Sequence, residues 1–138
     1  MREEIDFGSF QVTFLQSRHD TRDSLDMFEL TLSPTGRMPV PHYHEDWEET
    51  VYGLEGVVTY VIGGERHDIG PGQTAFVPRG VVHGFDNHTD AVAKCLCVLT
   101  PGRLGPDYFR ELAAEVRGGK PDPAVMRGIM QRYGLVPG

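Results

Sequence analysis

Hydrophobic and polar residues alternate, or apolar residues cluster, in short runs between positions 10 and 99. The runs span residues 10–15, 25–32, 57–62, 65–69, 74–77 and 91–99, and turns rich in glycine and proline separate them. Alternation places every second side chain on one face, which is typical of a β-strand buried on one side. Many short strands at regular spacing predict an all-β barrel or sandwich.

The spacing of apolar residues changes to a helical period after position 105. A first helix is predicted with Asp107 as its N-cap and Gly118 at its end, and a second between Asp122 and Gly134. Each helix has one apolar face, which we expect to pack against the body of the domain or a second subunit. We therefore predict one domain over residues 1–138, with a barrel core at about 9–102 and a helical tail at about 105–138.

Composition narrows the expected location and partners. The 138 residues carry a formal net charge of −7 without a basic cluster, which disfavours nucleic acids and anionic membranes as partners. There is no long apolar run, and the charged segment that follows Met1 lacks the apolar stretch of a secretory signal. We therefore expect a cytoplasmic protein. Cys95 and Cys97 lie two apart on a predicted strand, too far for an easy disulfide, so reduced thiols that fill the core are expected.

Candidate chemistry is concentrated between Gly36 and Gly56. His42 and His44 are two apart, so on a strand both imidazoles point to the same face. Glu49 follows at odd spacing, and a loop or bulge between them can return its carboxylate to that face. Two imidazoles and a carboxylate are three ligands for one divalent metal, and His83 in a second segment can supply a fourth.

Ten residues of this region form two strings with fixed intervals. The first string is Gly36, His42, His44, Glu49 and Gly56, and the second is Gly72, Pro78, Gly80, His83 and Asn87. At all ten positions these strings resemble the paired motifs of the cupin superfamily, and they cover residues 36–87. The resemblance implies a double-stranded β-helix (jelly-roll) barrel, here followed by two short C-terminal α-helices.

The resemblance also implies four metal ligands, namely His42, His44, Glu49 and His83. Glu48 is the alternative carboxylate, but the six residues from Glu49 to Gly56 fit the interval of the motif. Three imidazoles and one carboxylate suit one divalent ion of Fe, Mn, Ni, Co, Cu or Zn. Four protein ligands leave an open position on a five- or six-coordinate ion, which a catalytic metal requires. The remaining motif residues are expected to form turns, and Asn87 to hold a loop through backbone hydrogen bonds.

The ligand set is similar to that of quercetin dioxygenase-like small bacterial cupins. That similarity implies a metal-dependent dioxygenase that binds a small molecule and O2 in the barrel interior, with Glu49 as both ligand and base, and it implies a homodimer. The same ligands also suit a Lewis-acid isomerase, cyclase, lyase or decarboxylase, or a binding protein without catalysis. An apolar pocket is expected from Met38, Val40, Val51 and either Phe76 or Phe85, while Tyr43 and Trp47 lie at its mouth or pack in the core.

Overall fold

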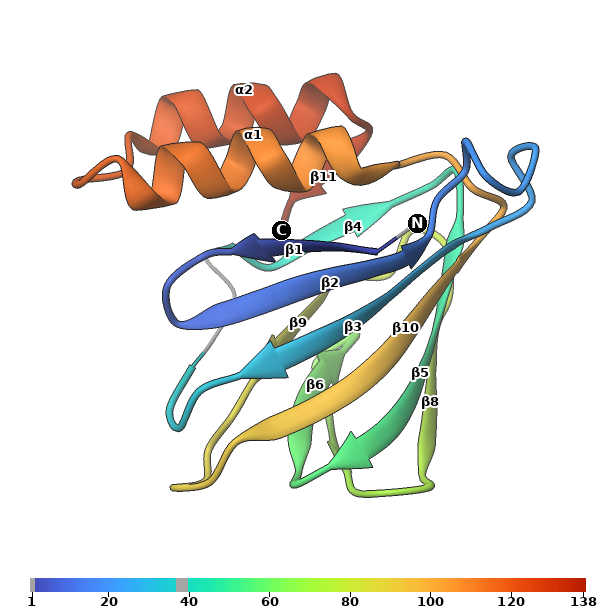
Figure 1. Ribbon diagram of the computed structural model, residues 1–138, viewed down its shortest axis with the longest axis vertical. Helices are drawn as coiled ribbons and strands as arrows, with labels where there is room; N and C mark the ends of the chain where they lie inside the picture. The colour runs from blue at the N-terminus through green and yellow to red at the C-terminus, as the bar shows by residue number, and fades with distance from the viewer. Residues whose placement is uncertain (1, 37–39) are drawn as a thin grey trace.

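A computed structural model describes residues 2–36 and 40–138. Within these residues the strands form two antiparallel sheets, and two helices cover one end (Figure 1). The larger sheet has the order β1 (Glu3–Asp6), β2 (Phe10–Gln16), β3 (Asp26–Leu32), β10 (Ala93–Thr100), β5 (Glu48–Glu55) and β8 (Thr74–Val77). The smaller sheet has the order β11 (Leu135–Pro137), β4 (His42–His44), β9 (His83–Asp86), β6 (Val58–Ile62) and β7 (Glu65–Ile69). This confirms the predicted all-β jelly roll.

The hydrophobic core lies between the inner faces of the two sheets. Residues of β3 alternate between buried and half-buried, with Phe28, Leu30 and Leu32 inside as their spacing predicts. Cys95 and Cys97 point inward from β10 without any exposed surface, and both thiols are free. Burial of each large apolar side chain stabilises the fold by about 1.5–3 kcal/mol.

Some residues of the paired motifs have structural roles that explain their identity. A Cβ on Gly36 would lie 2.4 Å from the backbone oxygen of Ser9, so no side chain fits there. The Asn87 side chain donates to the carbonyl groups of Ser33 and Ala91 and accepts from the N–H of Thr89. The prediction that Asn87 holds a loop is therefore confirmed.

The strand that carries the first two histidines is shorter than its sequence indicates. β4 begins at His42, because Pro41 has no N–H to donate to a neighbouring strand. Val40 lies in a bend before it, and Met38 lies outside the described residues.

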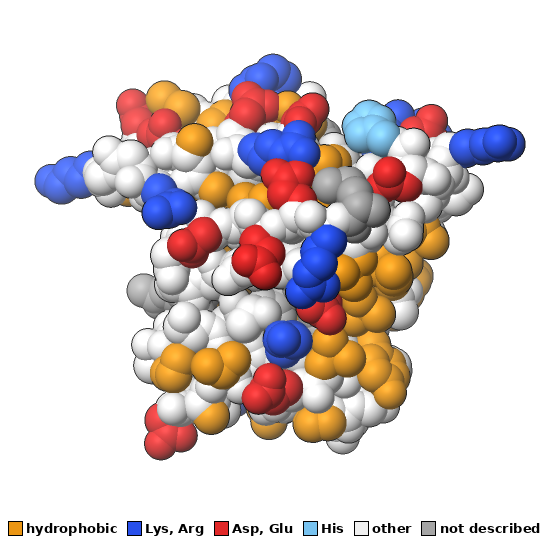
Figure 2. Space-filling model, in the orientation of Figure 1, with side chains coloured by type: hydrophobic (Ala, Val, Ile, Leu, Met, Phe, Trp, Pro, Cys, Tyr) orange, Lys and Arg blue, Asp and Glu red, His pale blue; other side chains and the backbone are white. Residues whose placement is uncertain are grey.

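The outer face of the larger sheet carries exposed apolar side chains. Figure 2 shows hydrophobic groups gathered over the lower part of this face, where β10, β5 and β8 lie. The exposed apolar residues of these strands include Tyr52 and Leu54 of β5 and Phe76 of β8, with 44%, 37% and 52% of their surfaces exposed. Of the two alternatives for the pocket lining, Phe76 is therefore excluded, because its side of β8 faces away from the core.

The two C-terminal helices pack on each other and close one end of the barrel (Figure 1). Helix α1 (Pro106–Arg117) is capped by Gly105 rather than by Asp107, because Pro106 takes the first helical position. Helix α2 (Pro123–Arg132) begins as predicted, with the Asp122 carboxylate accepting from the N–H of Ala124 at 2.9 Å. No helix among the described residues is long and apolar enough to span a membrane.

The chain returns to the barrel after α2 and forms β11, which the sequence does not predict. Leu135 pairs with His44, and Pro137 pairs with His42. The C-terminal tail thus supplies both a cover for the barrel and a neighbour for the strand that carries two histidines.

Candidate metal centre

Three histidines from two adjacent strands meet inside the barrel. His42 and His44 point inward from β4, and His83 lies directly opposite His42 on β9. One ligand nitrogen from each ring lies within 4.8 Å of those from the other two. Their exposed fractions are only 9%, 1% and 2%. Three imidazoles gathered in this way could hold one metal ion.

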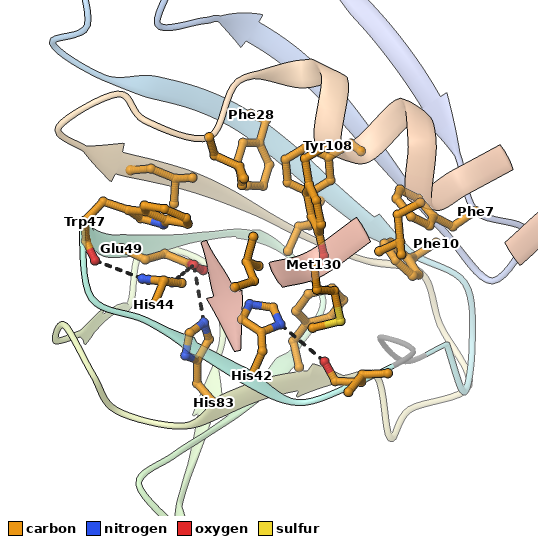
Figure 3. A pocket seen from close by; sticks show the side chains of 18 of the residues that line it. Phe7, Phe10, Phe28, His42, His44, Trp47, Glu49, His83, Tyr108 and Met130 are labelled. Carbon is orange, nitrogen blue, oxygen red and sulfur yellow. Dashed lines mark hydrogen bonds and ion pairs between the residues drawn. The ribbon is translucent and has the colours of Figure 1, made fainter. Parts of the chain in front are cut away.

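Glu49 reaches the histidines from the opposite sheet. Its Oε1 lies 3.7 Å from Nε2 of His83 and 3.9 Å from Nε2 of His44 (Figure 3). The odd spacing between the histidines and Glu49 needs no bulge, because β4 and β5 belong to different sheets whose inner faces oppose each other. Glu48 points outward and lies 3.7 Å from Arg79, so Glu49 is the acid that faces the histidines.

The second ring nitrogen of each histidine is held by the backbone. Nδ1 of His44 lies 2.9 Å from the carbonyl oxygen of Trp47, and Nδ1 of His83 lies 3.0 Å from that of Val81. Nδ1 of His42 contacts the Val40 carbonyl at 3.3 Å. A carbonyl oxygen only accepts, so each Nδ1 carries the proton and each Nε2 presents its lone pair to the site.

The Nε2 atom of His44 is the clearest sign that this site binds a cation. It is buried, and no group among the described residues gives it a hydrogen bond. The His44–Glu49 separation of 3.9 Å is too long for one, so that contact is electrostatic. A buried nitrogen without a partner is costly, and a divalent metal would satisfy it, so the residues present fit such an ion.

Burial sets the protonation states that a metal needs. It lowers the pKa of His42 to about 3, with a further contribution from the neighbouring histidines, and it also lowers the pKa of His83. Burial alone would raise the pKa of Glu49, but attraction to His44 and His83 and a hydrogen bond from Tyr60 outweigh it and lower that pKa to about 2. At neutral pH, His42 and His83 are therefore neutral and Glu49 is a carboxylate, which are the forms that bind metal.

Tyr60 fixes the orientation of Glu49, and sequence reasoning does not single it out. The Tyr60 hydroxyl on β6 donates to Oε2 of Glu49 at 2.9 Å, which leaves Oε1 facing the histidines. The same oxygen lies 3.5 Å from Sγ of Cys97, whose own Sγ lies 4.0 Å from that of Cys95. Burial raises the pKa of the Cys97 thiol. Tyr60 lies in an ordinary strand pattern, so nothing in the sequence separates it from a core residue.

The four candidate ligands line one end of a narrow apolar cavity of about 60 Å³. Figure 3 shows Trp47 and Glu49 at one end and Phe7 and Phe10 at the other. Val40 and Phe85 line the cavity as predicted, whereas Val51 is buried but does not line it. The helices and β11 contribute a wall that the sequence did not indicate, made of Tyr108, Phe109, Leu112, Met126, Met130 and Leu135.

Trp47 is a packing residue rather than a residue of the cavity mouth. Its indole is 2% exposed and stacks on the His44 ring with centroids 4.5 Å apart. Tyr43 points to the other side of β4, is half-buried and does not line the cavity. The stack fixes the plane of the His44 ring and so the direction of its Nε2.

Comparisons with known proteins agree with this arrangement. The cupin domain family model matches residues 28–99. Quercetin 2,3-dioxygenase of Bacillus subtilis (strain 168) is 38% identical over 87 residues, which are 62% of this chain and 25% of that protein. The chain thus spans a quarter of the length of this curated relative.

Solved structures show the same likeness. A polyketide cyclase from Streptomyces resistomycificus superposes with a TM-score of 0.59 and 33% identity, over 67% of this chain and 66% of that one. A predicted oxalate decarboxylase from Thermotoga maritima superposes with a TM-score of 0.65 over 73% of this chain and 92% of that one, but at 21% identity it supports the fold alone. The family match spans more than half of the 138 residues and includes all four candidate ligands. This chain therefore belongs to the cupin domain family.

Proposed function

We propose that this protein is a metal-dependent cupin dioxygenase that acts on a small organic molecule. The three histidines and Glu49 would hold one divalent metal, and the observation that carries the proposal is the unpartnered Nε2 of His44 among these converging groups. The likeness to quercetin 2,3-dioxygenase over 62% of the chain favours oxygen chemistry. Both oxygen atoms of O2 would enter the substrate, so the reaction needs no external reductant.

When bound, a redox-active divalent metal supplies a position where substrate and O2 meet and exchange electrons. The chain's own residues prepare that position. The Nδ1 hydrogen bonds orient the three imidazoles, and Tyr60 holds the Glu49 carboxylate with Oε1 toward them. The apolar walls exclude bulk water, which strengthens every charge interaction inside.

Glu49 serves primarily as a ligand in this proposal. A general base works best when its pKa lies near the operating pH, and the pKa of Glu49 is about 2. The carboxylate would therefore hold a substrate proton only briefly at Oε1, while Oε2 stays bonded to Tyr60.

The test combines metal analysis with oxygen uptake. Protein purified without added metal is analysed for its metal content, and O2 consumption is screened with flavonols and diketones. Iron, copper, nickel, cobalt or manganese together with uptake is the expected result. His42→Ala should lose metal and uptake together, whereas Glu48→Gln, a change at the outward-facing neighbour of Glu49, should keep both. Full metal occupancy in His42→Ala would contradict the ligand assignment.

Lewis-acid chemistry is the second candidate. Its specific support is the 33% identity to a polyketide cyclase over 67% of this chain. The same ligand set would then polarise a carbonyl group without any change of oxidation state. Zinc in the purified protein and no O2 uptake with any substrate would exclude the dioxygenase and favour this alternative.

A further inference from the structure

A second, larger cavity lies beside the metal cavity and opens to the surface. Its volume is about 480 Å³. Among the described residues it is lined by Phe7, Ser9, Phe10, Val40, Val116, Pro121, Pro123, Met126, Arg127 and Pro137. Ser9, Pro121, Pro123 and Arg127 are exposed, so solvent reaches it. We refer to this cavity as the outer groove.

The outer groove and the metal cavity share one wall. Phe7, Phe10, Val40 and Met126 line both, and we call these four side chains the partition. Phe7 and Phe10 lie at the end of the metal cavity farthest from Trp47 and Glu49 (Figure 3). A molecule that passes the partition from the groove therefore approaches the histidines along the length of the cavity.

The metal cavity alone is too small for an ordinary organic substrate. Its volume of about 60 Å³ is far below the roughly 300–1,000 Å³ of typical small-molecule sites, whereas the outer groove lies within that range. The groove is largely apolar, and Arg127 is the one charged side chain among its described lining residues. Its surface therefore suits an uncharged, apolar body.

We propose that the outer groove is the binding subsite for the apolar body of the substrate, whose oxygen-bearing end passes the partition to reach the metal centre. The substrate class is then an elongated aromatic or aliphatic molecule with oxygen donors at one end. This inference rests on the metal centre proposed above. The proposed subsite assigns substrate recognition mainly to the β1–β2 turn and the helical tail. Both lie outside residues 28–99, which the cupin domain family model matches.

The partition is a layer of side chains that an entering substrate would displace. It consists of four side chains from the β1–β2 region, the bend before β4 and α2. Met126 is unbranched and has three rotatable bonds, so it can change rotamer more easily than its neighbours. Phe7 and Phe10 stack on each other with centroids 4.3 Å apart, which makes them a continuous apolar surface along which a flat substrate can slide.

The experiment compares two probes on the metal-loaded protein, catechol and 4-n-hexylcatechol, by titration calorimetry. Catechol supplies only the metal-binding end, and the hexyl chain supplies an apolar body. Because each buried methylene contributes to affinity, the chain should tighten binding by about tenfold or more. Val116→Asp places a charge in the groove away from the metal cavity, and it should remove this gain while leaving catechol affinity unchanged.

Val125→Asp is the matched control, because Val125 is exposed on the same helical tail but lines neither cavity. It should bind both probes as the wild type does. Pro121→Asp, at an exposed groove position, repeats the test independently of the packing of α1. Equal hexylcatechol affinity in the wild type and both groove variants would overturn the subsite. Failure of the wild type to take up a divalent metal would instead refute the metal centre, and the subsite with it, whereas metal uptake without binding of either probe would overturn the subsite alone.

Discussion

The metal-free protein should lose stability in mild acid because of His42. Its pKa is about 3 in the folded protein, against an ordinary value of 6.5, mainly because the ring is buried. Below pH 6.5 the unfolded chain therefore takes up a proton at His42 that the folded protein does not accept until the pH approaches 3. Stability is unaffected above the ordinary pKa and falls as the pH drops through this window.

The size of the effect follows from the same values. Each pH unit within the window lowers the free energy of unfolding by up to about 1.4 kcal/mol. Between about pH 7.5 and about pH 5, His42 alone accounts for a loss of about 2 kcal/mol. The lowered pKa of His83 acts in the same direction. Glu49 contributes only below its ordinary pKa of 4.5, so this interval isolates the histidines.

Urea unfolding of chelator-treated protein measures this loss, and the fluorescence of Trp47, the only tryptophan in the chain, reports it. His42→Gln has no proton to take up and should lose about 2 kcal/mol less than the wild type over the same interval. His19→Gln is the control, because His19 is exposed in a loop, and it should follow the wild type. Identical losses in His42→Gln and the wild type would show that burial of His42 does not govern its protonation.

Three further predictions concern other residues. Tyr60→Phe removes the hydrogen bond to Glu49 and should lower the free energy of unfolding of the metal-free protein by about 2 kcal/mol in urea; no change would show that this bond is dispensable. Asn87→Ala removes several hydrogen bonds inside one loop and should cost about 3 kcal/mol in the same assay, and a loss below about 1 kcal/mol would contradict its role there. We propose a homodimer through the apolar outer face of the larger sheet, so Phe76→Asp should sediment as a monomer while Val125→Asp, at an exposed position of α2, stays dimeric; a monomeric wild type would refute it.

The sequence predicts the candidate ligands better than their surroundings. Turns and a strand pairing bring the four candidate ligands together, and this requires fixed intervals between them along the chain. Such intervals can be read directly from the sequence, as they are for His42, His44, Glu49 and His83. Tyr60 is different, because its contact with Glu49 depends on two strands from opposite sheets facing each other.

Short segments of the chain are the least predictable from its sequence. Alternation shows that Phe76 and Val77 point in opposite directions, but four residues do not reveal which of them faces the core. The apolar stripes of the helices predict burial without showing that they close the barrel end rather than cover its side. β11 has only three residues, which is too short for any periodic signal.

The pairing of β11 with β4 has a consequence for the order in which the site is assembled. During synthesis, the segment that contains all four candidate ligands leaves the ribosome before the helices and β11 do. A metal ion can therefore reach the histidines of a nascent barrel that is still open at one end. Once α1, α2 and β11 are in place they cover this end of the barrel, so an ion bound earlier would be enclosed by segments that are made after its ligands, and it would exchange only past the partition.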